Sequence, residues 1–157
     1  MKDFKYVEGN LTVKNKKKVA VISSRFNHFI VDKLEQGCLD TFSRQGEGNL
    51  DITVYKVPGA FELPLMAKWL AETKRFDGVV VLGAVIRGAT AHFEIVSNNC
   101  ATGVSRVSLD YGLPVIFGVI TVDTIEQAIE RAGTKAGNKG SEAAATLLEM
   151  LSLSECL

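Results

Sequence analysis

The sequence predicts a three-layer α/β fold, in which helices cover both faces of a four-stranded parallel sheet. Strand-like and helix-like segments alternate four times along the chain, the order from which parallel sheets with right-handed crossovers are built. Residues 79–86 are all apolar or small, which suits a strand buried on both faces. No linker, repeat or low-complexity tract interrupts the sequence, so residues 1–157 are expected to form one domain.

The first half of the chain contains two strand–helix units. Residues 18–24 predict a strand, and the apolar residues after it recur at every fourth position, which predicts a helix that ends near Gly46. These residues are Ile30, Leu34, Cys38 and Phe42. Apolar and polar residues alternate over positions 50–54, in a half-covered strand expected to end at Val57. Pro64 fits the first turn of the second helix, whose apolar residues are Met66, Trp69 and Leu70.

The second half begins with the strand at residues 79–86. The helix after it is expected to end near Tyr111, and its apolar stripe consists of Phe93, Val96, Cys100, Val104 and Val107. Residues 114–121 predict the fourth strand. Thr124 and Gln127 have the spacing of a capping box, which opens a short helix to about Ala132. Residues 133–140 break this helix, and a last helix presents Leu147, Met150 and Leu151 on one face.

The two ends of the chain are expected to form an N-terminal arm (residues 1–17) and a tail (residues 152–157). Leu11 and Val13 have the alternation of an extra strand. No crossover helix joins this segment to the main unit, so we expect it to pair with the sheet of another subunit.

Composition excludes several classes of protein. Lys plus Arg and Asp plus Glu both number 18, so no global charge favours nucleic acid or an anionic membrane. The lysines at positions 14, 16, 17 and 18 precede a strand and are interpreted as a solvated edge. No apolar run is long enough to cross a membrane, and the N-terminus lacks the apolar core of a secretory signal, so a cytoplasmic location is expected. Three widely spaced cysteines indicate neither a disulfide framework nor a zinc site.

Polar and aromatic residues follow the predicted strands. The carboxyl ends of parallel strands meet at one edge of the sheet, so four segments are expected to converge there. These are residues 23–27, residues 58–62, residues 87–90 with His92, and Phe117 with Thr121. Their aromatic rings suit a flat ligand, the carboxylate of Glu62 suits hydroxyl groups, and backbone N–H groups at a helix start suit a phosphate.

Each of these residues also has a simpler explanation. Phe26 could pack in the core, Glu62 could stabilise the helix dipole, and His92 could cap or pack at a helix start. Arg131 would be favourable near a helix C-terminus without any ligand. Cys100 lies on a helix stripe and is assigned to the core.

Several familiar site motifs are absent. No G-x-G-x-x-G follows a strand, and no G-x-S-x-G occurs. Residues 133–140 are similar to a Walker A loop, but Asn138 stands where that motif requires Gly, and the segment follows a helix rather than a strand. Two histidines without a nearby acidic pair argue against a catalytic metal, and no cofactor is predicted.

Four segments together resemble the lumazine synthase family: RFN at 25–27, PGAFE at 58–62, VLGAVIRGATAH at 81–92 and IEQAIERAGTKAGNKG at 125–140. They occur in the family's order between residues 19 and 151. The resemblance implies a flavodoxin-like fold and a condensation of 5-amino-6-(D-ribitylamino)uracil with 3,4-dihydroxy-2-butanone 4-phosphate. The product would be 6,7-dimethyl-8-ribityllumazine, in the penultimate step of riboflavin biosynthesis.

The resemblance further implies which residues hold the uracil substrate. Phe26 would stack on the pyrimidine ring, and Glu62 would accept hydrogen bonds from the ribityl hydroxyl groups, beside Ala60 and Phe61. The backbone that would hold the uracil edge is that of Ala84, Val85 and Ile86.

For the second substrate, the resemblance implies a phosphate site and a proton shuttle. Ala89 and Thr90 would cradle the phosphate, Arg131 would neutralise its charge, and His92 would transfer protons. Phe117 would reach the pyrimidine in a neighbouring subunit's site, and Lys135 would lie close to both substrates.

The same family comparison implies an assembly. Members form homopentamers with active sites between adjacent subunits, and a short connection at residues 133–140 goes with closed shells of 60 subunits. The short form occurs in this chain, which favours the icosahedral shell and makes riboflavin synthase a candidate enclosed partner.

Three alternatives remain at this point. A flavin- or nucleotide-binding module would use the same loops without giving His92 and Arg131 a joint task. A shell protein without catalysis would keep the assembly alone. The homologous riboflavin synthase of some archaea is nearer, but residues 25–27 and 133–140 favour lumazine synthase.

Overall fold

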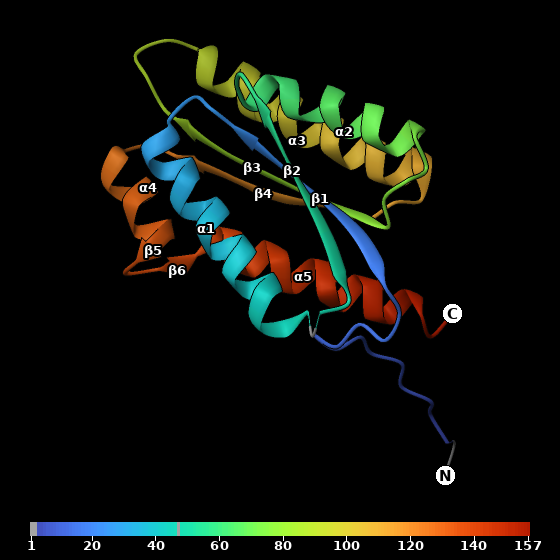
Figure 1. The fold of residues 1–157 in the computed structure, drawn as a ribbon. Helices are drawn as coiled ribbons and strands as arrows, with labels where there is room; N and C mark the ends of the chain where they lie inside the picture. Colours follow the sequence, from blue (N-terminus) through green and yellow to red (C-terminus); the bar gives the residue numbers. More distant parts are fainter. Residues whose placement is uncertain (1–2, 47) are drawn as a thin grey trace.

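The computed structural model describes residues 3–46 and 48–157, which form a four-stranded parallel sheet between two layers of helices (Figure 1). The strands are β1 (Lys17–Ser24), β2 (Leu50–Val57), β3 (Gly78–Ile86) and β4 (Val115–Val122). The helices are α1 (His28–Gln45), α2 (Leu63–Glu72), α3 (His92–Tyr111), α4 (Ile125–Arg131) and α5 (Lys139–Ser154). The strand order is β2-β1-β3-β4, so the predicted fold class is confirmed.

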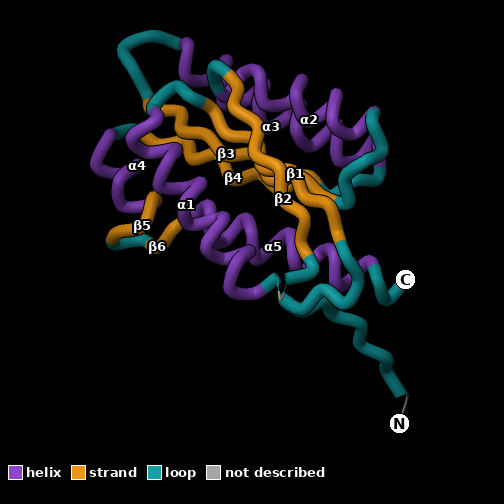
Figure 2. Tube along the Cα trace, in the orientation of Figure 1, coloured by secondary structure: helices purple, strands orange, loops and turns teal. Residues whose placement is uncertain are grey.

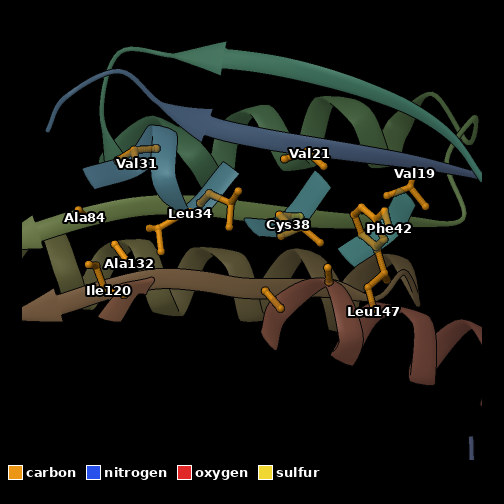
Figure 3. Packing of buried hydrophobic residues seen from close by; sticks show 14 of the residues in the cluster. Val19, Val21, Val31, Leu34, Cys38, Phe42, Ala84, Ile120, Ala132 and Leu147 are labelled. Atoms are coloured by element: carbon orange, nitrogen blue, oxygen red, sulfur yellow. The ribbon is translucent and has the colours of Figure 1, made fainter. Parts of the chain in front are cut away.

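The central strand β3 explains the continuous apolar run in the sequence. All its residues are buried up to Val85, because helices cover both of its faces. Val80 and Leu82 belong to the core cluster under α1 and α5, whereas Val79 and Val81 belong to the cluster under α2 and α3. Figure 3 shows the first of these clusters, in which side chains of α1 meet those of β1, β4 and α5.

Most predicted boundaries are confirmed. Every apolar residue predicted for the first helix is buried in α1, and the N–H of Gly46 closes the helix by donating to the carbonyl of Phe42. At α4, the hydroxyl of Thr124 accepts from the N–H of Gln127, as predicted. In a capping box the Gln127 side chain would accept from the N–H of Thr124, but here it accepts from the N–H of Asp123.

The segment that breaks the helix at residues 133–140 contains a small hairpin that the sequence did not predict. Strands β5 (Ala132–Thr134) and β6 (Gly137–Asn138) pair in antiparallel fashion, with Gly133 and Gly137 at φ 114° and 73°. The side chain of Asn138 then caps α5 by accepting from the N–H groups of Gly140 and Ser141. Asn138, which argued against a P-loop in the sequence, is therefore a helix cap.

The prediction for the last helix was wrong in one residue. Leu147 and Leu151 are fully buried, but Met150 is exposed. Each helical residue turns by about 100°, which places Leu151, Ala144 and Leu148 on one side of Leu147 and Met150 on the other side, outside the stripe. The helix also continues to Ser154, into the segment predicted as a tail.

The N-terminal arm forms no strand within residues 3–16 of this single chain. Leu11 is exposed, whereas Val13 is fully buried in the core cluster under α1 and α5. The carboxylate of Glu155 accepts hydrogen bonds from the backbone N–H groups of Lys14 and Asn15, which attaches the arm to the end of α5. Strand pairing with another subunit stays a prediction. The end of α5 and the arm residues attached to it lie at the edge of the sheet where β1 begins (Figure 2).

Candidate active site

A pocket lies at the carboxyl ends of β1, β2 and β3. The chain leaves β1 toward α1 on one face of the sheet and leaves the adjacent β3 toward α3 on the other face, as Figure 1 shows. Loops that diverge in this way leave a crevice between them, where open α/β sheets bind ligands. The pocket has a volume of about 700 Å³, enough for a small organic molecule.

The structure brings nine of the predicted site residues together around this pocket. They come from three loops and the end of β3, so the expected convergence at the carboxyl edge occurs for these segments. They are Phe26, Ala60, Phe61, Glu62, Ala84, Val85, Ile86, Thr90 and His92.

The aromatic rings at the mouth of the pocket are available for stacking. Phe26 is 71% exposed and Phe61 is 53% exposed, so neither ring packs in the core of this chain. The alternative explanation of Phe26 as a core residue is therefore excluded. Exposed rings beside a pocket offer large apolar surfaces to a flat ligand.

Asn27 fixes the turn that carries Phe26, a role that the sequence reasoning missed. Its backbone is in the left-handed region (φ 58°, ψ 39°), and its carbonyl accepts from the N–H groups of Ile30 and Val31. Its side-chain Nδ2 donates to the carbonyl of Ala84 at 2.9 Å. The β1–α1 turn is thereby tied to the end of β3. The sequence feature that could have revealed this role is an Asn in the short turn between a strand and a helix, since Asn tolerates this conformation.

Glu62 lies where the short 3₁₀ helix of Ala60–Glu62 leads into α2. Its side chain is half-buried and receives no hydrogen bond from the described residues. A Cβ added at Gly59 would lie 3.1 Å from Glu62 Oε2, so the glycine leaves this carboxylate room. Glu62 can therefore accept hydrogen bonds from a ligand, and it also favours the helix dipole.

His92 begins α3 and is exposed at the rim of the pocket. The preceding residue, Ala91, makes no side-chain cap to the helix. The first N–H groups of α3 are therefore not satisfied by a capping side chain, and they suit an anion at this position. Ala89 lies in the same exposed loop but does not line the pocket.

Phe117, Arg131 and Lys135 do not line the pocket of this chain. The prediction that placed Phe117 in a loop at the carboxyl edge was wrong, because β4 continues to Val122 and Phe117 pairs with Val81 in its middle. Thr121 also lies within β4, opposite Val85. Phe117 is 39% exposed on this edge strand.

Arg131 ends α4, which packs through Ala128 into the cluster under α1 and α5. His92 belongs to the layer on the other face of the sheet. Lys135 is exposed in the turn between β5 and β6. One chain therefore supplies the aromatic, carboxylate and imidazole groups of the pocket without the guanidinium of Arg131.

The cysteines that the fold buries are structural. Cys38 and Cys100 are fully buried, and burial raises the pKa of each thiol to about 12. Both thiols are therefore neutral packing groups, which confirms the core assignment of Cys100.

Residues 3–46 and 48–157 contain neither a cluster of metal-ligating side chains nor a membrane-spanning helix. No set of three or more His, Cys, Asp or Glu side chains is grouped as a metal site would require. In the same part of the chain, no helix combines the length and hydropathy needed to span a bilayer.

The comparison with known families gives one match. A family model described as 6,7-dimethyl-8-ribityllumazine synthase matches residues 16–155 of the 157 in this chain. The matched range contains every residue that lines the pocket, from Phe26 to Val96.

Proposed function

The chain belongs to the 6,7-dimethyl-8-ribityllumazine synthase family, and from this premise we propose the reaction that it catalyses. It condenses 5-amino-6-(D-ribitylamino)uracil with 3,4-dihydroxy-2-butanone 4-phosphate, and it releases 6,7-dimethyl-8-ribityllumazine, phosphate and water. The observation that supports this most is the pocket at the carboxyl edge, where two exposed rings, a free carboxylate and an imidazole surround about 700 Å³.

The uracil substrate binds in the part of the pocket between Phe26 and the end of β3. Phe26 stacks on the ring, and the backbone of residues 84–86 pairs with the polar edge of the uracil. The ribityl chain lies along Ala60 and Phe61, with its hydroxyl groups donating to Glu62. This assignment uses the exposure of Phe26 and the absence of a competing partner for Glu62 among the described residues.

The phosphate of the second substrate binds at the start of α3. Ala89 and Thr90 provide the loop, and the free N–H groups of the helix start point toward the anion. Arg131 neutralises the phosphate, in a charge-assisted contact of about 1.5–3 kcal/mol. Because Arg131 lies outside the pocket of its own chain, it comes from a neighbouring copy.

His92 transfers protons during the condensation. The primary amine attacks the ketone and forms an imine with loss of water, phosphate leaves, and attack of the ribitylamino nitrogen on the remaining carbonyl closes the ring with loss of a second water. Each step moves a proton, and a positioned general acid–base contributes about 10²–10⁴-fold. Orientation of the two substrates in one pocket supplies much of the remaining acceleration.

The site is completed by assembly. Phe117, Arg131 and Lys135 of an adjacent copy close the pocket, in a homopentamer whose interfaces repeat head to tail. The short hairpin at residues 132–138 supports closure of twelve pentamers into a 60-subunit shell, with riboflavin synthase as a candidate enclosed partner and a cytoplasmic location.

Incubation of the protein with both substrates, followed by detection of the lumazine product, tests the reaction. A flavin- or nucleotide-binding module would bind one substrate without turnover. A mixing experiment tests the shared site: His92→Ala and Arg131→Ala chains, each impaired alone, are unfolded together and reassembled, and turnover is measured at a butanone phosphate concentration below the KM of the Arg131→Ala variant. About a quarter of the sites in a random head-to-tail ring would regain both groups. If the mixture is no more active than the average of its two components, the site is not shared between subunits.

A further inference from the structure

Arg87, directly after β3, is the centre of a cluster that the sequence reasoning did not use. Its Nε donates to Asp123 Oδ1 at 2.7 Å, and its Nη1 donates to Glu94. Its guanidinium carbon lies 4.3 Å from the centre of the Phe93 ring, and this ring lines the pocket. One side chain therefore joins the end of β3 to the first turn of α3 and to the β4–α4 connection.

These contacts enclose the loop proposed to hold the phosphate. Residues 88–91 lie between Arg87 and Glu94 and are all exposed. Space is open around Gly88, since a Cβ there would meet nothing within 4 Å. In residues 3–46 and 48–157, no side-chain hydrogen bond reaches residues 88–91. The loop therefore depends on the groups at its two ends for its conformation.

The guanidinium of Arg87 is occupied by contacts with Asp123, Glu94 and the Phe93 ring. Two carboxylates share it and the Phe93 ring covers one face, so the guanidinium charge is more than neutralised within the cluster. The hydrogen bonds to Asp123 and Glu94 raise the pKa of Arg87 above its ordinary value, and the hydrogen bond from Arg87 lowers the pKa of Glu94. Arg87 and Glu94 are therefore both charged near neutral pH.

We propose that Arg87 is a positioning residue, which holds the 88–91 loop in the conformation that binds the phosphate of the substrate. The proposal rests on the proposed function, because that function places the phosphate at this loop. A loop held at both ends loses less conformational freedom when a ligand binds, so pre-organisation increases affinity. Arg87 acts through the loop and does not touch the phosphate.

The direct alternative predicts the opposite sign for one substitution. If Arg87 bound the phosphate itself, Glu94→Ala would free the guanidinium and remove a negative charge near an anion, and phosphate would bind more tightly. If Arg87 holds the loop, Glu94→Ala loosens one end and phosphate binds less tightly. Loss of the Glu94 charge by itself favours an anion in both cases, so weaker phosphate binding in Glu94→Ala can come only from the loosened loop.

The experiment makes two measurements on the assembled protein. Calorimetry measures the binding of inorganic phosphate, and hydrogen–deuterium exchange without any ligand measures the mobility of the peptide that contains residues 88–93. Arg87→Gln and Glu94→Ala are each expected to speed exchange in this peptide and to weaken phosphate binding about twofold to fivefold. The KM for the butanone phosphate should rise by the same factor, while the KM for the uracil substrate stays unchanged.

Asp110→Ala is the matched control, since Asp110 pairs with Arg106 at the other end of α3 and its loss removes the same charge. It should change neither exchange in residues 88–93 nor phosphate binding. Unchanged exchange in Arg87→Gln, or tighter phosphate binding in Glu94→Ala, would overturn the proposal. Failure of the wild-type protein to form lumazine would instead refute the proposed function, while the ligand-free exchange still reports on the loop.

Discussion

Asn27 shows how one residue can connect a loop to the site. Its backbone adopts a conformation that costs most residues free energy, and its amide reaches the carbonyl of Ala84. The exposed ring of Phe26 beside it and the backbone of β3 are therefore held relative to each other. Both belong to the proposed uracil site.

Substitution of Asn27 separates these two contributions. Asn27→Gly loses the hydrogen bond but keeps the conformation, whereas Asn27→Ala also incurs the left-handed strain of about 1–2 kcal/mol. We expect Asn27→Ala to have the lower free energy of unfolding in denaturant titrations, and both variants to have a raised KM for the uracil substrate. Equal stabilities would show that the backbone conformation contributes no strain.

His92 is expected to matter for turnover and not for folding. The side chain is exposed, so His92→Ala should leave the circular dichroism spectrum and thermal midpoint unchanged. The kcat should fall by about 10²-fold or more, because no other imidazole lines the pocket within the described residues. A variant that unfolds would identify His92 as a structural residue.

Loss of the Arg131 side chain should change the KM of only one of the two substrates. Loss of a charge-assisted contact of about 1.5–3 kcal/mol predicts a KM for the butanone phosphate raised about tenfold or more in Arg131→Ala. The KM for the uracil substrate is the internal control. An unchanged KM for the phosphate substrate would remove Arg131 from the phosphate site.

At the scale of elements, α1 and α5 pack unusually closely. A Cβ on Gly140 would lie 1.8 Å from the backbone oxygen of Leu34, whereas a Cβ on Gly37 would meet the side chain of Asn138 at 2.5 Å. Backbone cannot move aside as a side chain can. The contact between these helices therefore depends on Gly140 more than on Gly37.

Two alanine substitutions test this contact. Gly140→Ala is expected to lower the free energy of unfolding by the upper end of the overpacking range, about 1–3 kcal/mol, or to prevent folding. Gly37→Ala is the matched comparison and should cost less, because displacing the Asn138 amide weakens the cap of α5 but forces no backbone apart. Denaturant titration of both variants measures the difference, and a larger loss in Gly37→Ala would contradict the packing argument.

The elements that the sequence predicted are those with long buried faces. The spacing in α1 and the apolar run of β3 follow directly from burial on one or two sides. The hairpin at 132–138 was missed because a pair of very short strands has no periodicity, and Met150 was misplaced because a spacing of three lies at the edge of a helical stripe. Phe117 was grouped with the segments at the carboxyl edge although residues 114–121 were predicted as a strand, and it pairs in the middle of β4.

The sequence predicted the part of the candidate site that lies at the carboxyl edge of the sheet. Carboxyl ends of neighbouring strands converge, which places Phe26, Glu62 and His92 together. The Arg87 cluster could not be predicted, because Asp123 is 36 residues away in sequence and nothing local marks the contact. Groups that a second chain would supply are equally invisible in the sequence of one chain.

At the scale of the whole molecule, Glu155 attaches the N-terminal arm. Burial alone would raise its pKa, but the N–H groups of Asn15 and Lys14, the side chain of Asn15 and the charge of Lys17 together lower the pKa below its ordinary value of 4.5. The ionised carboxylate is therefore the form that stabilises the folded state.

This lowered pKa predicts a pH dependence. The stabilisation is complete above the unfolded-state pKa of 4.5 and is lost as the pH falls through the lower folded-state pKa. Glu155→Gln mimics the protonated form, so its melting temperature should lie below that of the wild type near neutral pH. The difference should close at pH values below 4.5, and a constant difference across this range would exclude Glu155 as the titrating group.

Exposed apolar side chains support an assembly. Phe4, Tyr6, Trp69 and Leu109 are each at least 55% exposed in the single chain. Large exposed apolar groups in such numbers are typical of surfaces that other subunits cover. Light scattering should give the mass of a 60-subunit particle, and a pentamer or decamer would refute the shell.

The position of the C-terminal end of α5 has a practical consequence. It lies near the edge of the sheet where β1 begins, since Glu155 contacts Lys14 and Asn15 just before that strand, whereas the pocket opens at the edge where the strands end. A fluorescent tag or a surface tether attached to the C-terminus through a flexible linker would project away from the loops that line the pocket. The protein can therefore be immobilised or labelled at this end with the pocket unobstructed within the subunit.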